Sequence, residues 1–343
     1  MSASPRPSLP ASAPAFRYEG RFDRANPAGP VVIWAGSRID LDFGGDTLLL
    51  HFTDAKGQNF FDADLDGHTI VFGMSEGGVG RVDFQLPPAP DGRHRLRLFK
   101  RSEAAAGTVR FAGATLKLGA PSWPPAPFPP RPRFLFLGDS ITVGACNEDG
   151  AADQWESYRT HNHALSYATL TARALQADHQ TIAVSGMGIV TGYVEPKAPE
   201  VWDRLYPVAG SARADLAAWT PDTVFLNFGE NDDSFTRTNA QPFPTDAFVA
   251  GYLGLARAIR AAWPRARLVL LRGGMTCGHH GEQLVPAWER IVRELQAGEP
   301  GVEAYAFQHF SELHPRTADH HAMAAELVAW LKTKPALLTP AGS

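Results

Sequence analysis

The chain has little cysteine: Cys146 and Cys277 are the only two among 343 residues. Two cysteines cannot form the disulfide framework that holds many small secreted domains together. We therefore expect two reduced thiols. A single bridge between them stays open as the alternative, and with it the redox compartment.

Long apolar runs and an excess of basic residues are also missing. No run approaches the roughly 18 apolar residues of a membrane-spanning helix. The formal net charge is −4, from 32 Lys and Arg against 36 Asp and Glu. Because no basic surplus is available for a nucleic-acid backbone or an anionic membrane, we expect neither as a partner. Nothing in the sequence indicates the oligomeric state.

The first residues lack the pattern of a secretory signal peptide. MSASPRPSLPASAPAF has no charged start followed by an apolar core. Its richness in Pro, Ser and Ala predicts a flexible leader over residues 1–14. A short tail is expected at the other end, over residues 336–343.

What the first third of the chain does contain is a series of short apolar segments. TLLLHFTDA, TIVFGMSEG and HRLRLFKRS are rich in Leu, Ile, Val and Phe, and Gly or Asp-Gly turns separate such segments. Short strands at this spacing, with no helical stretch between them, predict an antiparallel β-sandwich. We expect this jelly-roll-like domain over residues 15–120.

A proline-rich segment then divides the chain. PSWPPAPFPPRPR, residues 121–133, has seven prolines in thirteen positions. Such a run favours polyproline II and cannot enter a helix or the interior of a sheet. We therefore expect a linker over residues 121–132.

Strand and helix patterns alternate after this linker. Continuous apolar runs predict strands buried on both faces, and apolar positions at i, i+3, i+4 and i+7 predict helices. The expected strands are 134–137, 181–184, 223–228, 267–272 and 302–306, and the expected helices are 162–177, 211–219, 246–262, 283–297 and 317–332. Regular alternation predicts a parallel sheet between two helix layers, an α/β/α domain over residues 133–335.

Four polar or glycine positions follow strands of this predicted sheet. They are Ser140, Gly188, Asn231 and His314. Because ligands bind at the carboxyl ends of parallel strands, we expect these residues at one edge of the sheet. A serine hydroxyl is a weak nucleophile that needs a base, which His314 can supply. Acyl transfer also needs donors for an oxyanion, and the N–H groups of Ser140 and Gly188 and the Asn231 amide are suitable.

Each of these residues also has a simpler structural reading. A lone serine before a helix is most often an N-cap. Asn231 alone is a common turn residue, and His314 alone is an ordinary surface residue at a helix start. Gly186 is the alternative to Gly188 as oxyanion donor. The four residues in this order, each after a strand, favour the catalytic reading.

Other polar residues are expected to be structural. Cys277, His279 and His280 are metal-ligand types, but their spacing is crowded and no second pair matches it. We therefore expect no metal, and no cofactor. The residues expected in turns, in packing or on the surface are Asp139, Trp202, Trp288, His309, His320 and His321. His161 and His163, with Trp155, either line an acyl or sugar pocket or, as we expect, lie in a surface loop.

The blocks GDS, a turn glycine, GxND and HP resemble those of the SGNH (GDSL-type) hydrolase superfamily, over residues 134 to about 333. The chain is further similar to the two-domain acetyl esterases of carbohydrate esterase family two, which place a β-sandwich ahead of the hydrolase domain. The stretches that carry this similarity are GRFDRANPAGPVVIWAGSRIDLDF, NFFDADLDG, GDSITVG, AVSGMGIV and HPRTADHHAMA.

This resemblance implies a serine esterase that removes O-acetyl groups from plant polysaccharides or sugars. Ser140 is then the nucleophile and His314 the base, while Gly188 and Asn231 complete the oxyanion hole. It also implies a secreted or periplasmic location. Two other functions stay open: a short-chain lipase or thioesterase with the same site, and a non-catalytic protein that binds carbohydrate through its sandwich domain.

The sequence departs from the superfamily just before the histidine. Most members carry Asp three residues earlier, where this chain has Ser311, and Glu312 lies two residues earlier. Either Glu312 or a backbone carbonyl is expected to orient the imidazole. Leu313 stands where related esterases often carry an aromatic residue, which argues against the binding of long polysaccharides more than against ester hydrolysis.

Overall fold

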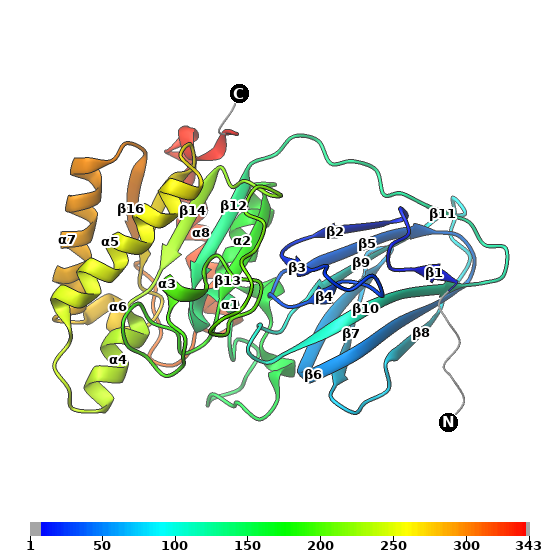
Figure 1. Cartoon of the computed structure of the whole chain (residues 1–343), viewed down its shortest axis with the longest axis horizontal. Coiled ribbons are helices and arrows are strands. Elements are labelled where there is room, and N and C mark those ends of the chain that lie inside the picture. The colour runs from blue at the N-terminus through cyan, green and yellow to red at the C-terminus, as the bar shows by residue number, and fades with distance from the viewer. Residues whose placement is uncertain (1–7, 341–343) are drawn as a thin grey trace. The chain divides into compact units, whose positions relative to one another are not determined.

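The structure is a computed structural model of the chain and describes residues 8–340. It divides into two compact units, with the boundary between Phe128 and Pro129. Figure 1 shows that strands dominate the first unit, whereas strands and helices alternate in the second. In the described part of the chain, no helix has the length and apolar character needed to cross a membrane.

The first unit is an antiparallel β-sheet that curls around a core, as predicted. Its strands are β1 (Leu9–Pro10), β2 (Phe16–Glu19), β3 (Phe22–Asp23), β4 (Val31–Val32), β5 (Arg38–Phe43), β6 (Thr47–Leu65), β7 (His68–Ser75), β8 (Arg81–Gln85), β9 (His94–Lys100), β10 (Gly107–Leu116) and β11 (Ser122–Trp123). Their order is β11-β5-β9-β6-β10-β4-β3, and the remaining strands pair off this path.

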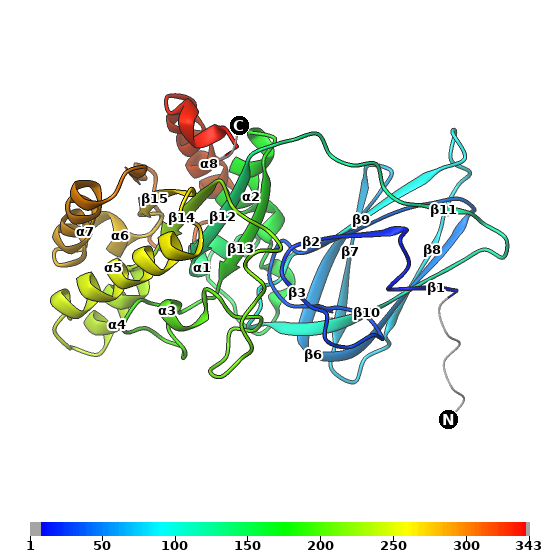
Figure 2. The same cartoon turned by 45° about the horizontal axis from the view of Figure 1, so that its top comes forward.

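The long strand β6 links the two halves of this curled sheet (Figure 2). Its first part pairs with β8 and β10, and its second part pairs with β7 and β9. Leu48, Leu50 and Phe52 from the first part share one core with Phe61 and other alternate residues of the second part. Because side chains alternate between the faces of a strand, one strand contributes inward residues to both halves.

The predicted leader is wrong for residues 8–14. Strand β1 pairs with β10, with Leu9 opposite Ala114. Ala11 is buried, and its carbonyl accepts a hydrogen bond of 2.6 Å from the Tyr18 hydroxyl. Backbone pairing holds a segment whose side chains offer little apolar bulk, so composition alone does not reveal it. The remainder of the predicted leader, residues 1–7, lies outside the described residues.

Parts of the predicted linker and tail also belong to the folded units. Strand β11 pairs with β5 of the first unit. The Arg17 guanidinium donates to the Ala126 carbonyl at 2.6 Å and lies 3.8 Å from the centre of the Phe128 ring. At the other end, the 3-10 helix η3 (Pro335–Leu338) buries Leu337 in the core of the second unit. Residues 341–343 lie outside the described residues.

The second unit contains the predicted parallel sheet. Its order is β13 (Asp178–Ala183), β12 (Arg133–Gly138), β14 (Thr223–Asn227), β15 (Arg267–Arg272) and β16 (Val302–Ala306). All neighbouring strands are parallel. All five expected strands form, within three residues of their predicted ends, because each is an apolar run buried on both faces.

Helices cover both faces of this sheet, as expected of an α/β/α domain. Helices α2 (Tyr167–Ala174) and α8 (Thr317–Lys332) pack together over a face that contains Phe134, Phe136 and Phe225. Helix α5 (Thr245–Ala262) packs against α3 (Ala198–Val201) and α7 (Leu284–Gly298) on the opposite side (Figure 2). The 3-10 helices η1 (Tyr158–Thr160) and η2 (His163–Leu165) precede α2.

The predicted helix over residues 211–219 is wrong. Arg213 forms a β-bridge with Arg204, the Ala217 N–H donates to Asp215, and the Trp219 ring N–H donates to Asp178 at 3.0 Å. Such side-chain and backbone bonds compete with helical pairing. Four short α-helices of the described residues lie outside the predicted ranges: α1 (Ser140–Val143), α3, α4 (Glu230–Thr238) and α6 (Thr276–His280).

Candidate active site

Ser140 is the first residue of the short helix α1, directly after strand β12. Asp139 is the N-cap, and its Oδ1 accepts a hydrogen bond of 3.0 Å from the Ile141 N–H. A Cβ atom at Gly138 would lie 2.1 Å from Thr142 Oγ1, so this sharp turn has no room for a side chain there. Asp139, rather than Ser140, is therefore the residue that caps this helix.

Gly188 lies in a tight loop after strand β13. A Cβ atom there would lie 1.8 Å from the Thr191 carbonyl oxygen and 2.7 Å from Asp232 Oδ2. In residues 8–340, neither the Gly188 N–H nor the Ser140 N–H donates a hydrogen bond to another group of the chain. Both donors are thus available, as the oxyanion prediction requires.

The carboxylate of Asp232 holds this loop in place. It accepts hydrogen bonds of 2.9 Å from the N–H groups of Ile189 and Val190 and of 3.1 Å from that of Thr191. Asp232 lies in the first turn of α4, beside Asn231. One side chain therefore fixes the three backbone groups that follow Gly188.

Asn231 lies next to the nucleophile turn, as expected, but its amide already has partners. Its Nδ2 donates to Asp139 Oδ2 at 3.0 Å and to the Met187 carbonyl at 3.2 Å. An amide nitrogen carries two hydrogens. Donation to an oxyanion would have to replace or share one of these bonds, so this role of Asn231 stays a prediction.

Three buried carboxyl groups gather behind this edge of the sheet. Burial raises the pKa of Asp139 well above its usual range, and the nearby Glu230 and Asp232 add to the increase. The hydrogen bond from the Ile141 N–H lowers this pKa, but its effect is smaller. Burial likewise raises the pKa of Asp232 to about 6 and raises that of Glu230. Glu230 accepts hydrogen bonds from the N–H groups of Cys277 and Gly278 at the start of α6, so its side chain holds this helix in place.

His314 pairs with an aspartate that the sequence did not suggest. Its Nδ1 lies 2.6 Å from Asp153 Oδ2, and its backbone N–H donates to the same oxygen at 3.4 Å. Burial tends to raise the pKa of Asp153, but hydrogen bonds from His314 and Arg316 outweigh it and lower the pKa below its ordinary value. Asp153 is therefore a charged acceptor that can hold the imidazole in one tautomer.

Neither of the expected partners orients His314. Glu312 is exposed, and the contact at the imidazole Nδ1 goes to the Asp153 carboxylate rather than to a backbone carbonyl. Asp153 lies 161 residues before the histidine, in the loop that follows the nucleophile helix. No spacing in the sequence marks it, because only the fold brings these two loops together.

The histidine segment is fastened to the segment after the nucleophile helix. The Thr317 N–H and hydroxyl both donate to the Asn147 carbonyl at 2.9 Å. Arg316 donates to the Cys146 carbonyl at 3.0 Å and to Asp153 Oδ1 at 2.7 Å. In the part of the chain that the structure describes, no hydrogen bond joins Ser140 to His314. Such bonds often tighten only when substrate binds.

His161 and His163 are buried rather than in a surface loop. Burial lowers the pKa of His163 to about 4, and its ring nitrogens face the Val143 carbonyl and Thr181 Oγ1. Trp155 is 41% exposed, and its ring packs edge-on to His314 with centroids 5.2 Å apart. Trp155, but not His163, is placed to border a substrate site.

The structure also shows the surroundings of the remaining candidates. Cys146 and Cys277 are free thiols. Among residues 8–340, Cys277, His279 and His280 do not form a group of three metal ligands, and His279 instead stacks on Phe310. Trp202, Trp288 and His320 are buried, His309 pairs with Asp319 at 2.7 Å, and His321 is exposed.

Two family descriptions match this chain. Residues 18–126 match the carbohydrate esterase 2 N-terminal family. Residues 136–334, which include Ser140, Asp153 and His314, match the GDSL-like lipase/acylhydrolase family. The two matched ranges fall in the first and the second unit.

Several proteins resemble this chain over nine-tenths or more of its length. The cellulase/esterase CelE of Acetivibrio thermocellus is 30% identical over 94% of this chain, which spans 40% of that relative. An acetylxylan esterase/glucomannan deacetylase of Cellvibrio japonicus is 28% identical, over 90% of this chain and 87% of its own. A family two carbohydrate esterase from Clostridium thermocellum, solved with cellohexaose, is 30% identical with a TM-score of 0.83, over 94% of this chain and all of that one.

Proposed function

Since the chain belongs to the GDSL-like lipase/acylhydrolase family and carries a carbohydrate esterase 2 N-terminal domain, we propose that it is a serine esterase that removes O-acetyl groups from carbohydrates. The observation that carries this proposal is the 2.6 Å contact between His314 Nδ1 and the charged Asp153. It supplies the oriented base that a serine nucleophile needs.

The first half of the reaction forms an acyl-enzyme. His314 Nε2 takes the proton of the Ser140 hydroxyl, and Ser140 Oγ attacks the acetyl carbonyl carbon. Asp153 stabilises the imidazolium that forms. His314 then gives the proton to the leaving sugar oxygen, so that the carbon–oxygen bond of the ester breaks and the free hydroxyl departs.

The negative oxygen of the tetrahedral intermediate needs hydrogen-bond donors on the side away from His314. The available N–H groups of Ser140 and Gly188 support this role, and Asn231 is the third candidate. Water then attacks the acetyl-serine with His314 again as the base, which releases acetate and restores Ser140. These steps use side chains and backbone of the second unit alone.

The substrate class is proposed from the relatives and from one exposed ring. Relatives are described as acetylxylan esterase/glucomannan deacetylase and as a carbohydrate esterase in complex with cellohexaose. Beside His314, the half-exposed Trp155 offers a flat apolar face, a surface on which a sugar ring can pack. This ring offers the flat aromatic face that a leucine at position 313 lacks.

The test is acetate release from acetylated xylan, acetylated glucomannan and p-nitrophenyl acetate, by the wild type and by Ser140→Ala. We expect release from at least one polysaccharide by the wild type and a loss of orders of magnitude in the variant. Near-normal activity of Ser140→Ala would contradict the serine mechanism.

A series of p-nitrophenyl esters separates the acetyl esterase from a lipase or thioesterase. An acetyl esterase should lose activity sharply beyond the butyrate ester, because its acyl site is small. Rising activity on longer chains, with no release from either polysaccharide, would favour the other enzyme class.

A further inference from the structure

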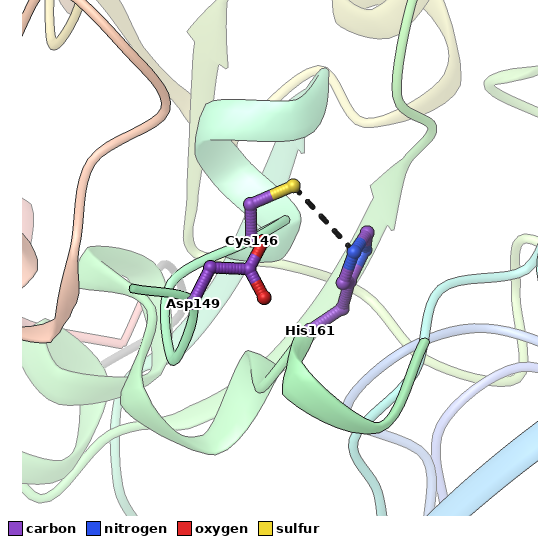
Figure 3. Close-up of side chains that lie close together, drawn as sticks. All are labelled: Cys146, Asp149 and His161. Carbon is purple, nitrogen blue, oxygen red and sulfur yellow. Dashed lines mark hydrogen bonds between the residues drawn. The ribbon is translucent and has the colours of Figure 1, made fainter. Parts of the chain in front are cut away.

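A thiol, an imidazole and a carboxylate meet just past the nucleophile helix, outside the proposed reaction steps. Cys146, Asp149 and His161 each offer one ligand atom, and these atoms lie within 4.8 Å of one another (Figure 3). Cys146 and His161 are buried, and Asp149 is half-buried between two exposed neighbours, Glu148 and Gly150. The cluster is therefore reachable from solvent on the side of Asp149.

The spacing of two ligand atoms in this cluster matches the spacing around a tetrahedral metal ion. A zinc–sulfur bond of about 2.3 Å and a zinc–nitrogen bond of about 2.05 Å, at a tetrahedral angle, place the two ligand atoms about 3.6 Å apart. In the structure, Cys146 Sγ lies 3.5 Å from His161 Nε2. The thiol and imidazole are thus already at the spacing that such an ion requires.

We propose that Cys146, Asp149 and His161 bind one Zn²⁺ ion, or a transition-metal ion of similar preference, and that this binding inhibits the esterase. A thiolate, an imidazole and a carboxylate are the ligand types that such ions select. Three protein ligands leave a fourth position for water. The ion takes no part in the hydrolysis.

The loop that carries the ligands is held before any ion arrives. Asn147 exchanges hydrogen bonds with the backbone of Asn162, of 2.9 Å and 2.8 Å, so both ends of the loop lie side by side. Asp149 accepts the Gln154 N–H at 2.9 Å. The His161 ring packs between Trp155 and Tyr158. A preorganised set of ligands lowers the ordering cost of binding.

Binding exchanges one proton and no electrons. The Cys146 thiol loses its proton to the buffer and its sulfur forms the bond to the metal. His161 Nε2 now lies 3.1 Å from the Gln154 carbonyl. When the ion binds, this contact is lost and the imidazole carries its proton on Nδ1, so that Nε2 can coordinate the metal. Asp149 coordinates through a carboxylate oxygen.

The inhibition follows from the closeness of the same thiol to Asp153 and His314. Cys146 Sγ also lies within 4.8 Å of ligand atoms of Asp153 and His314. A divalent cation beside Asp153 offsets the negative charge that stabilises the His314 imidazolium. This part of the proposal rests on the proposed function, whereas the binding itself does not.

The test uses Co²⁺ with the full chain, because a cobalt–thiolate bond gives a charge-transfer absorption band. We expect a band that saturates at one equivalent and is removed by Zn²⁺, in the wild type and in the matched control Cys277→Ser. The band should be lost in Cys146→Ser and in His161→Gln. Circular dichroism of the metal-free variants checks that each has folded.

Three outcomes would overturn the site. They are no thiolate band in the wild type, a band lost in Cys277→Ser but kept in Cys146→Ser, and a band kept in His161→Gln. The last would mean that the thiol binds the ion with Asp153 and His314 instead. If Cys146→Ser does not fold, the wild type and His161→Gln still decide.

Acetate release is the separate readout for inhibition. Zn²⁺ should abolish activity of the wild type, a chelator should restore it, and Cys146→Ser should resist the metal. A bound ion without loss of activity would overturn the inhibitory part. If no esterase activity exists at all, the proposed function fails while the cobalt spectrum still decides the metal site.

Discussion

At the scale of single residues, the pairing of Asp153 with His314 decides the chemistry that the second unit can perform. A neutral imidazole has two tautomers, and only the one with hydrogen on Nδ1 leaves Nε2 free to accept the serine proton. The charged Asp153 selects that tautomer through its contact with Nδ1. Arg316 holds the other carboxylate oxygen, so the acid itself is oriented.

We expect Asp153→Asn to lower kcat by roughly 10²–10⁴-fold on p-nitrophenyl acetate, because an amide can favour the wrong tautomer and lacks the charge that stabilises imidazolium. Steady-state kinetics measure the change. The matched control is Glu312→Gln, which removes the exposed acid next to Leu313 and should leave kcat unchanged. A large loss in Glu312→Gln and none in Asp153→Asn would reverse the assignment.

Asp232 should make the stability of the second unit depend on pH. Burial raises its pKa from 3.8 to about 6. Between these values the folded chain holds the proton more tightly than the unfolded chain, so the contribution of Asp232 to stability falls as the pH rises. The size of this fall is up to about 3 kcal/mol.

The measurement is the free energy of unfolding of the wild type and of Asp232→Asn between pH 4 and 7. The variant cannot titrate at this position. We therefore expect the stability of the wild type relative to the variant to decrease as the pH rises to about 6 and then to level off. A difference that is constant over this range, or that grows with pH, would contradict the shifted pKa.

At the scale of elements, short helices at the strand ends build the candidate site. Helix α1 carries Ser140, and α4 carries Asn231 and Asp232 in its first turn. Their short lengths give no hydrophobic period to read, so neither is among the helix ranges that the sequence predicts. Tertiary hydrogen bonds hold them, such as the contacts from Asp232 to the loop after β13.

The strand β1 gives a prediction at this scale. Removing residues 1–14 should lower the Tm of the first unit relative to removal of residues 1–7 alone, because β10 loses its pairing partner and Tyr18 loses the Ala11 carbonyl. Differential scanning calorimetry of the two shortened chains measures this. Equal Tm values would mean that residues 8–14 do not stabilise the first unit, as expected of the flexible leader that the composition predicts.

At the scale of the whole molecule, the two units have separate hydrophobic cores. One core lies inside the curled antiparallel sheet, and another lies between the parallel sheet and helices α2 and α8. Every residue with a proposed role in hydrolysis lies in the second unit. The stability of the protein and its hydrolysis of a small ester should therefore respond differently to changes in the two cores.

Two buried, stacked phenylalanines test this separation. Phe61 stacks on Phe72 in the first unit, and Phe136 stacks on Phe225 in the second. Each substitution by Ala should cost about 3–5 kcal/mol of stability. Below the unfolding temperature, Phe61→Ala should keep kcat on p-nitrophenyl acetate, whereas Phe136→Ala should lower it because β12 leads directly into the turn and helix that carry Ser140. Loss of kcat in Phe61→Ala would show that the first unit contributes to hydrolysis.

The sequence by itself determined the two fold types, the five parallel strands and the edge at which Ser140, Gly188, Asn231 and His314 lie. Apolar runs, helical periods and turn residues are local signals, and parallel strands bring their carboxyl ends to one edge whatever the details. The GDS, GxND and HP blocks are likewise contiguous in the chain, so they can be read without a fold.

Only the tertiary structure decided that Asp153 orients His314, that Cys146 meets Asp149 and His161, and that residues 8–14 pair with β10. The first two are side-chain contacts within or between loops and the third is backbone pairing with a strand, and no period or fixed spacing in the sequence marks any of them. Their geometry is set by the packing of the loops after β12 and β16 in the second unit and by the antiparallel sheet of the first unit, which are properties of the folded chain.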